Sequence, residues 1–205
     1  MSHGNGNGGK FGLNRRPAWA HDRAVTSPTM SRDSAWLASH LRDVPDFPRP
    51  GVVFKDLTPL LADVDAFRYA VDAIADHAAG LTVDKVVGIE ARGFIFAAAV
   101  AYRLGAGFVP VRKTGKLPWK TVTETYELEY GTDTLELHED GIAPNDSVYV
   151  VDDVLATGGT AAATCRLVER LGGVIAGLAF VVELGFLDGR AKLPKEYDVL
   201  ALVTV

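Results

Sequence analysis

Apolar residues occur along this chain in two kinds of run. Apolar residues at helical spacing predict helices over 65–79, 94–104 and 159–171. Short, continuously apolar runs of the kind found in buried strands lie at 85–89, 107–111, 147–151, 175–182 and 199–203. Strands that are apolar throughout and alternate with helices predict an α/β fold, in which helices flank both faces of a mostly parallel central sheet.

The N-terminal part of the chain departs from this alternation. Residues 1–30 mix Gly, Asn, Ser, Pro and Arg without periodicity, which predicts a disordered arm, an expression remnant or an over-long start. A short helix should follow, capped by Ser31 or Asp33. Three prolines and a glycine within 44–51 then predict a rigid, non-helical crossing. We therefore expect an arm followed by one domain, 31–205.

Composition narrows the class of protein. The chain has 205 residues, 48% of them apolar, which suits one domain with a self-sustaining core. No apolar run reaches the roughly 20 residues of a bilayer-spanning helix, so we expect a cytoplasmic protein with no membrane partner. A formal net charge of −5 argues against nucleic acid as a partner and favours a small molecule. The single cysteine, Cys165, is expected to be a small buried side chain.

The most informative residues follow the strand predicted at 147–151. Ligands of parallel sheets bind at the carboxyl ends of the strands, and here Asp152 and Asp153 precede a turn that opens a helix. The turn consists of Ala156, Thr157, Gly158, Gly159 and Thr160. Its converging N–H groups, its hydroxyls and the helix terminus predict a cradle for one phosphate. Carboxylates beside such a cradle suit the hydroxyls of a ribose, although the two acids could also be simple helix caps.

The apolar run, the two acids and the Thr-Gly-Gly-Thr turn resemble the ribose diphosphate motif of the type I phosphoribosyltransferases. Other segments resemble the branch of that family that acts on adenine, and the resemblance covers residues 35–205. These segments are 47–56, 88–94, 111–118 and 126–131. The resemblance implies the type I phosphoribosyltransferase fold, with a small N-terminal hood (about 31–60), a flexible lid loop (about 113–138) and assembly as a homodimer. It also implies a pentosyltransferase of purine salvage, which converts adenine and 5-phosphoribosyl 1-diphosphate to AMP and diphosphate.

Two basic clusters follow the two strands that precede the ribose motif. Arg92 lies in a short turn, where a guanidinium fork and backbone amides can hold a diphosphate; the alternative is a surface ion pair with Glu90. Arg112, Lys113 and Lys116 lie in a loop that either contacts a diphosphate or is only solvated. By resemblance, Arg92 is catalytic and Lys113 and Lys116 bind the diphosphate. Mg²⁺ is expected as the cofactor, bound through substrate and water with no direct protein ligand.

The base site rests mainly on the resemblance. Val53, Phe54 and Lys55 follow the proline-rich crossing, where an apolar slot can stack a flat ring; the alternative is a core strand. The resemblance implies main-chain hydrogen bonds from Val53 and Lys55 and stacking by Phe54, and we also place Leu155 at the adenine. Several relatives carry arginine at the position of Lys55, which matters little if recognition uses the backbone.

Residues 121–138 alternate like a strand, with Glu127 and Glu129 on the face opposite the apolar residues. Taken alone, this pattern makes Glu129 a solvent-facing residue. The resemblance instead implies that Glu129 is the acid/base group at the purine, on a lid that keeps water from a ribosyl cation.

Two other functions remain open on the sequence. One keeps the reaction and changes the base to hypoxanthine, guanine or xanthine. The other is a regulator that binds the sugar diphosphate without catalysis and contacts DNA. The acidic composition and the lack of a DNA-reading motif disfavour the regulator, and the combination of Arg92, Glu129 and the 152–160 segment favours an enzyme.

Overall fold

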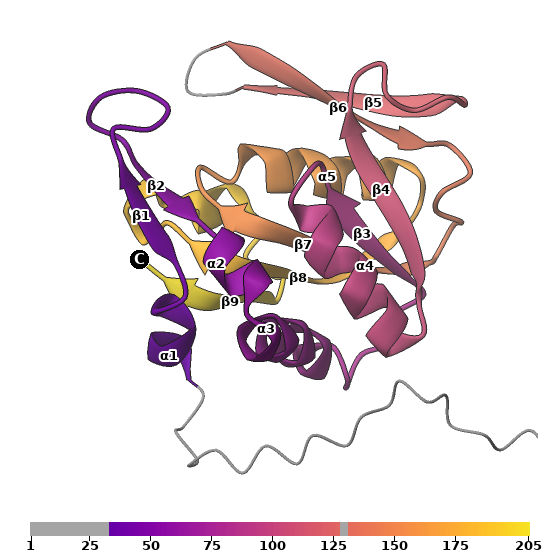
Figure 1. The fold of residues 1–205 in the computed structure, drawn as a ribbon. Coiled ribbons are helices and arrows are strands. Elements are labelled where there is room, and N and C mark those ends of the chain that lie inside the picture. The colour runs from indigo at the N-terminus through magenta and orange to yellow at the C-terminus, as the bar shows by residue number, and fades with distance from the viewer. Residues whose placement is uncertain (1–32, 128–130) are drawn as a thin grey trace, which may run out of the picture. The chain divides into compact units, whose positions relative to one another are not determined.

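The computed structural model describes residues 33–127 and 131–205, so the predictions for residues 1–30 fall outside the described part. A seven-stranded sheet has the order β5-β6-β4-β3-β7-β8-β9, and β1 and β2 form a separate two-stranded sheet (Figure 1). In chain order the elements are α1 (Ser34–Ala38), β1 (Arg42–Pro45), β2 (Val53–Asp56), α2 (Thr58–Ala62), α3 (Val64–His77), β3 (Lys85–Ile89), α4 (Gly93–Leu104), β4 (Gly107–Lys113), β5 (Thr121–Glu127), β6 (Thr132–His138), β7 (Ser147–Leu155), α5 (Gly159–Arg170), β8 (Val174–Glu183), the 3-10 turns η1 (Gly185–Leu187) and η2 (Gly189–Lys192), and β9 (Val199–Thr204).

The larger sheet is mostly parallel, as predicted. Strands β4, β3, β7, β8 and β9 pair in parallel, and β6 and β5 extend the sheet in antiparallel pairing. The segment expected as a lid loop is therefore largely a hairpin. No helix in the described part of the chain is long and apolar enough to cross a membrane.

Side chains of the central strand β7 serve two separate cores. Val148 and Val150 pack in the core on the α5 face, whereas Tyr149 and Val151 pack in the core formed with α3 and α4. Burial on both faces explains why residues 148–151 of this strand are all apolar. Cys165, a residue of α5, is buried in the core, as predicted, and burial raises the pKa of its thiol to about 12.

Strand β7 is longer than the run 147–151 that the apolar pattern predicts. Its pairing with β8 continues through Asp152, Val154 and Leu155, so the backbone ladder extends beyond the apolar residues. Asp152 and Asp153 thus belong to the strand rather than to the turn after it. Strand β4 is also longer than predicted, because Lys113 pairs with β6.

The N-terminal segment forms the β1–β2 hairpin and α2. Asp33 caps α1 by accepting the N–H of Trp36 at 2.9 Å, as expected. The proline-rich crossing is non-helical, as expected, and joins two strands; the carboxylate of Asp46 accepts the N–H of Gly51 at 2.8 Å within it. Helix α2 was not predicted, because five residues are too few to show a helical period.

The packing of α4 on β3 can be tested at Gly88. A Cβ at this position would lie 2.7 Å from the Cβ of Ala97 and 2.8 Å from a ring atom of Phe108. We expect Gly88→Ala to lower the free energy of unfolding by about 1–3 kcal/mol, measured by urea denaturation. Gly80→Ala is the control, because a Cβ there meets nothing within 4 Å. Equal stability of the two variants would contradict the close contact.

Candidate functional site

An ion pair joins the end of β7 to the start of α4. The side chains of Asp152 and Asp153 are buried, and Oδ2 of Asp153 lies 2.6 Å from Nε of Arg92, the residue that precedes α4. Oδ1 of Asp152 accepts the backbone N–H of Asp153 at 2.9 Å. The alternative partner proposed for Arg92, Glu90, instead pairs with other cations.

Burial raises the pKa of both carboxyls. The pKa of Asp152 lies well above its usual value because the group is desolvated and because Asp153 is charged nearby. Burial also raises the pKa of Asp153, although the charge of Arg92 opposes this shift. Two desolvated acids side by side destabilise the folded protein, and hydroxyl donors from a ligand would lower that cost.

The turn 156–160 forms a cradle next to these acids. Gly158 has a φ of 76° and precedes the first residue of α5, so the N–H groups of the first helical turn are free to bind a ligand. A cavity of about 80 Å³ is lined by this turn together with Asp152, Val154, Leu155 and residues of the core. The structure therefore brings the predicted phosphate cradle and the predicted ribose acids together.

A second glycine supports the turn, and sequence reasoning missed it. A Cβ on Gly158 would lie 2.1 Å from the carbonyl oxygen of Gly189, and a Cβ on Gly189 would lie 2.2 Å from that of Ala156. Arg190 fixes the supporting segment, because its Nε donates to both carboxylate oxygens of Glu183, at 2.7 and 2.9 Å. This contact between segments about thirty residues apart leaves no local pattern.

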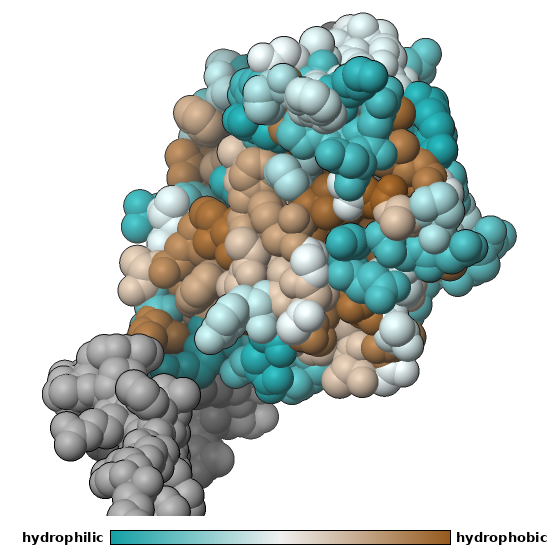
Figure 2. Space-filling view, turned by 90° about the vertical axis from the view of Figure 1, so that its right-hand side faces the viewer, coloured by the Kyte–Doolittle hydropathy of each residue, from teal (hydrophilic) through white to brown (hydrophobic). Residues whose placement is uncertain are grey.

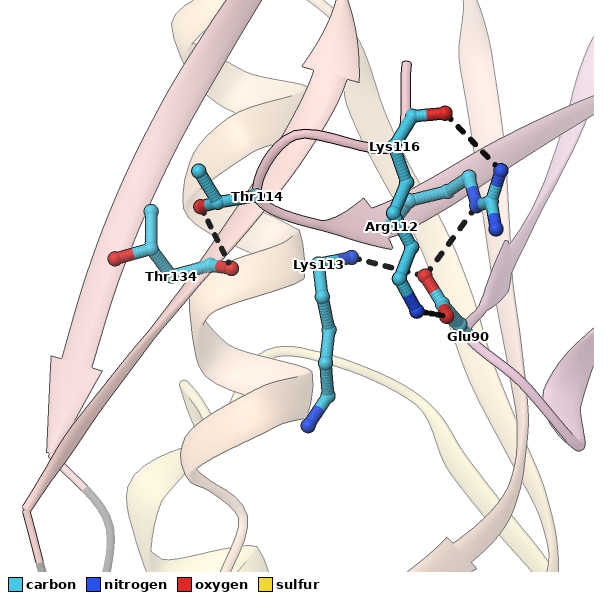
Figure 3. Close-up of polar contacts among 6 residues, drawn as sticks. All are labelled: Glu90, Arg112, Lys113, Thr114, Lys116 and Thr134. Atoms are coloured by element: carbon cyan, nitrogen blue, oxygen red, sulfur yellow. Dashed lines mark hydrogen bonds and ion pairs between the residues drawn. The ribbon is translucent and has the colours of Figure 1, made fainter.

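The basic residues at the end of β4 and in the loop that follows are organised around Glu90 (Figure 3). The carboxylate of Glu90 accepts hydrogen bonds from Nε of Arg112 at 3.3 Å, from the backbone N–H of Lys113 at 3.1 Å and from Nζ of Lys116. Burial alone would raise the pKa of Glu90, but the hydrogen bonds from Lys116 and Lys113 outweigh it and lower the pKa. Glu90 is thus an anchor for this loop, which the sequence did not indicate.

The side chain of Lys113 points away from Glu90 (Figure 3). Its Nζ lies 3.0 Å from Oδ2 of Asp133 on β6. Each cation predicted for the diphosphate is therefore paired with a carboxylate in the described part of the chain: Arg92 with Asp153, Lys113 with Asp133, and Lys116 with Glu90.

The predicted base residues line a cavity of about 320 Å³. Its walls come from 52–55 in the β1–β2 hairpin and from Arg92, Asp153, Val154, Ala156 and Leu184. The guanidinium carbon of Arg92 lies 5.1 Å from the ring centroid of Phe54. Strand β2 belongs to a partly exposed two-stranded sheet, so the alternative of a core strand is wrong.

Two residues predicted at the base site, Lys55 and Leu155, do not point their side chains into the base cavity as free groups. Nζ of Lys55 lies 2.7 Å from Oδ1 of Asp43, so this side chain is engaged within its own hairpin. Leu155 is buried and lines only the smaller cavity at the turn, whereas Val154 lines that cavity and the base cavity. Side chains alternate along a strand, and β7 continues through both residues, which sequence reasoning had not anticipated.

The β5–β6 hairpin contacts the start of α5. The hydroxyl of Thr160 donates to the hydroxyl of Tyr126 at 3.2 Å, and Glu124 pairs with Arg166 at 2.6 Å. Glu129, predicted as the acid/base group, lies outside the described residues.

Comparison with known proteins places these features in one family. The family described as "Phosphoribosyl transferase domain" matches residues 59–204. The adenine phosphoribosyltransferase of Acidobacterium capsulatum is 58% identical over 176 residues, covering 86% of this chain and 97% of that protein. The enzyme of the same name from Thermobifida fusca is 56% identical over 177 residues, covering 86% of this chain and all of that protein.

Solved structures agree. The adenine phosphoribosyltransferase from Rhodothermus marinus superposes with a TM-score of 0.81 at 51% identity, covering 84% of this chain and 98% of that one. The enzyme from Saccharomyces cerevisiae, complexed with an imino-altritol bisphosphate and adenine, gives a TM-score of 0.79 at 41% identity, covering 82% of this chain and 97% of that one.

The cost of the buried acids predicts a stabilising substitution. An unfolded aspartate ionises near pH 4, whereas the raised pKa of Asp152 makes ionisation harder in the folded protein. The wild-type chain therefore loses stability as the pH rises from the unfolded pKa to the folded one. We expect Asp152→Asn to raise the melting temperature at pH 7 and to lose this advantage towards pH 4.

Thermal unfolding between pH 4 and pH 8 measures this effect. Asp140→Asn makes the same change of charge at an exposed turn and is the control. A lower melting temperature for Asp152→Asn at every pH would show that the carboxylate is not destabilising.

Proposed function

Because this chain belongs to the adenine phosphoribosyltransferase family, we propose that its site transfers a 5-phosphoribosyl group from 5-phosphoribosyl 1-diphosphate to adenine. The type I phosphoribosyltransferase fold and the pentosyltransferase class expected from the sequence are confirmed. One observation carries the proposal for the site. The phosphate cavity and the base cavity share Val154 and Ala156, and Asp152 lines the first while Asp153 lines the second. A ribose with a phosphate at one end and a base at the other fits this arrangement.

In this proposal the turn 156–160 binds the 5′-phosphate through backbone N–H groups and hydroxyls. Asp152 and Asp153 accept hydrogen bonds from the ribose hydroxyls. Adenine occupies the base cavity, where Phe54 stacks on the ring and the backbone of Val53 and Lys55 supplies hydrogen bonds. The side-chain pair of Lys55 with Asp43 agrees with recognition through its backbone.

Transfer breaks the bond between C1′ and the diphosphate and forms a bond between C1′ and N9 of adenine, so positive charge develops on the ribose. Arg92, Lys113 and Lys116 stabilise the negative charge that collects on the leaving diphosphate. Holding both substrates in line supplies a large part of the acceleration. Glu129 takes the proton that adenine loses, and the hairpin that carries it excludes water.

Magnesium fits the charge balance of this site. The described residues contain no group of three or more His, Cys, Asp or Glu side chains that could hold a metal by themselves. The cations of the site already face carboxylates, so a diphosphate adds negative charge that needs compensation. Bound Mg²⁺ supplies that positive charge through substrate oxygens and water, and Asp152 and Asp153 are the carboxylates placed to accept hydrogen bonds from its water ligands.

We also propose that the protein is a cytoplasmic homodimer. Figure 2 shows apolar side chains gathered on the face that includes α4. Ile95 and Tyr102 of α4 are exposed, as is Phe108 near the start of β4, and Tyr102 is 91% exposed. A contiguous exposed apolar surface of this kind is typical of an interface, and a second copy of the chain would cover it.

The proposed function is tested by incubating the protein with 5-phosphoribosyl 1-diphosphate, Mg²⁺ and each purine in turn. We expect AMP from adenine and no nucleotide from hypoxanthine, guanine or xanthine. If a nucleotide forms only from hypoxanthine, guanine or xanthine, that purine and not adenine is the substrate. Binding of the sugar diphosphate without any turnover would indicate a regulator.

The proposed acid/base group is tested by Glu129→Leu. We expect kcat to fall about 100-fold or more, because proton transfer by a positioned side chain contributes on that order. The dissociation constant of the sugar diphosphate should stay nearly unchanged, and Glu139→Leu serves as the control, since Glu139 is exposed just beyond β6. An unchanged kcat would remove Glu129 from the mechanism.

A further inference from the structure

The β5–β6 hairpin contacts the diphosphate end of the site through Asp133. Its carboxylate lies 3.0 Å from Nζ of Lys113, and its other oxygen accepts the backbone N–H of Thr134 at 2.8 Å. The hydrogen bond and the charge of Asp133 raise the pKa of Lys113, so the pair is ionic. A diphosphate that binds Lys113 must therefore compete with this carboxylate for the ammonium group.

The same hairpin contacts the 5′-phosphate end through Tyr126. The phenol accepts the hydroxyl proton of Thr160, a residue that lines the phosphate cavity. Tyr126 is nearly buried, and this burial raises the pKa of its phenol, so the contact is a neutral hydrogen bond. A phosphate in the cradle must compete for the hydroxyl of Thr160.

Tyr126 and Asp133 face each other across the hairpin as paired positions of β5 and β6, and the phenol of Tyr126 hydrogen-bonds to the carboxylate of Asp133. One cross-strand pair of residues thus contacts both Lys113 and Thr160, the residues proposed to bind the two ends of the sugar diphosphate. The two contacts are made with side chains that the proposed function assigns to the substrate, whereas Glu124 ties the hairpin to α5 outside the site. This division points to a role beyond packing.

We propose that Asp133 and Tyr126 are positioning residues through which the hairpin competes with the two ends of the sugar diphosphate for Lys113 and Thr160. The inference rests on the proposed function, since it assigns Lys113 and Thr160 to that substrate. The substrate must break these two contacts in order to bind, so the contacts lower its affinity. Substrate binding therefore separates Asp133 from Lys113 and Tyr126 from Thr160.

The diphosphate end is tested with Asp133→Asn, which keeps the shape and removes the charge. Calorimetry with magnesium diphosphate should show about threefold tighter binding, because a partly exposed ion pair of this kind is worth a factor of that size. Binding of ribose 5-phosphate should change less than binding of magnesium diphosphate, because Asp133 reaches Thr160 only through Tyr126. The effect should vanish in a Lys113→Met background, because the carboxylate then has no cation to withhold.

The phosphate end is tested with Tyr126→Phe, which keeps the buried ring. Ribose 5-phosphate should bind about twofold to threefold more tightly, because the hydroxyl of Thr160 is released. Binding of magnesium diphosphate should change less, because Tyr126 reaches Lys113 only through Asp133. In steady-state assays both variants should lower KM for the sugar diphosphate and leave KM for adenine unchanged. A purely structural defect would move both constants.

Asp140→Asn, which removes one negative charge just after β6, is the control for general electrostatics. Unchanged or weaker diphosphate binding by Asp133→Asn overturns the proposal, and so does unchanged or weaker ribose 5-phosphate binding by Tyr126→Phe. Equal effects of either variant on the two ligands also overturn it. The steady-state assay of the wild-type protein distinguishes failure of this proposal from failure of the proposed function. Absence of wild-type turnover would reject the proposed function itself.

Discussion

The ion pair between Arg92 and Asp153 holds three parts of the site in one place. It joins the end of β7 to the start of α4, and the same guanidinium lies over the ring of Phe54 in the N-terminal hairpin. The ribose acids, the diphosphate turn and the base cavity therefore share one side chain. Because Asp153 is buried, removal of Arg92 would leave a desolvated carboxylate without its counter-charge, which is far more costly than the loss of a surface pair.

Like Arg92, the other basic residues at the carboxyl edge of the sheet are paired with carboxylates. Lys113 pairs with Asp133 and Lys116 pairs with Glu90, so the protein's own carboxylates hold these cations in place and offset the repulsion between them. The cost falls on the acids, since burial raises the pKa of Asp152 and that of Asp153. Such a site sacrifices stability for a geometry that only a ligand completes, a common feature of functional sites.

The sequence predicted those parts of the site that are local in the chain. The acids at 152 and 153 and the turn 156–160 are contiguous, and the apolar strand before them fixes their place at the sheet edge. The anchoring role of Glu90 and the support from Gly189 could not be predicted, because each depends on contacts between distant segments. The base cavity is lined by Val154 and not by the predicted Leu155, which also could not be read from the sequence. This arrangement follows from pairing of β7 with β8 beyond the apolar run, which no local pattern records.

The central claim is that adjoining cavities at the end of β7 hold one nucleotide, with its phosphate at the turn and its base at the hairpin. The crystal structure of the protein with AMP tests it most directly. We expect the 5′-phosphate on the N–H groups of 157–160, the ribose hydroxyls at Asp152 and Asp153, and the purine against Phe54. A nucleotide phosphate bound at Lys113 and Lys116 instead, with the turn left empty, would contradict the account.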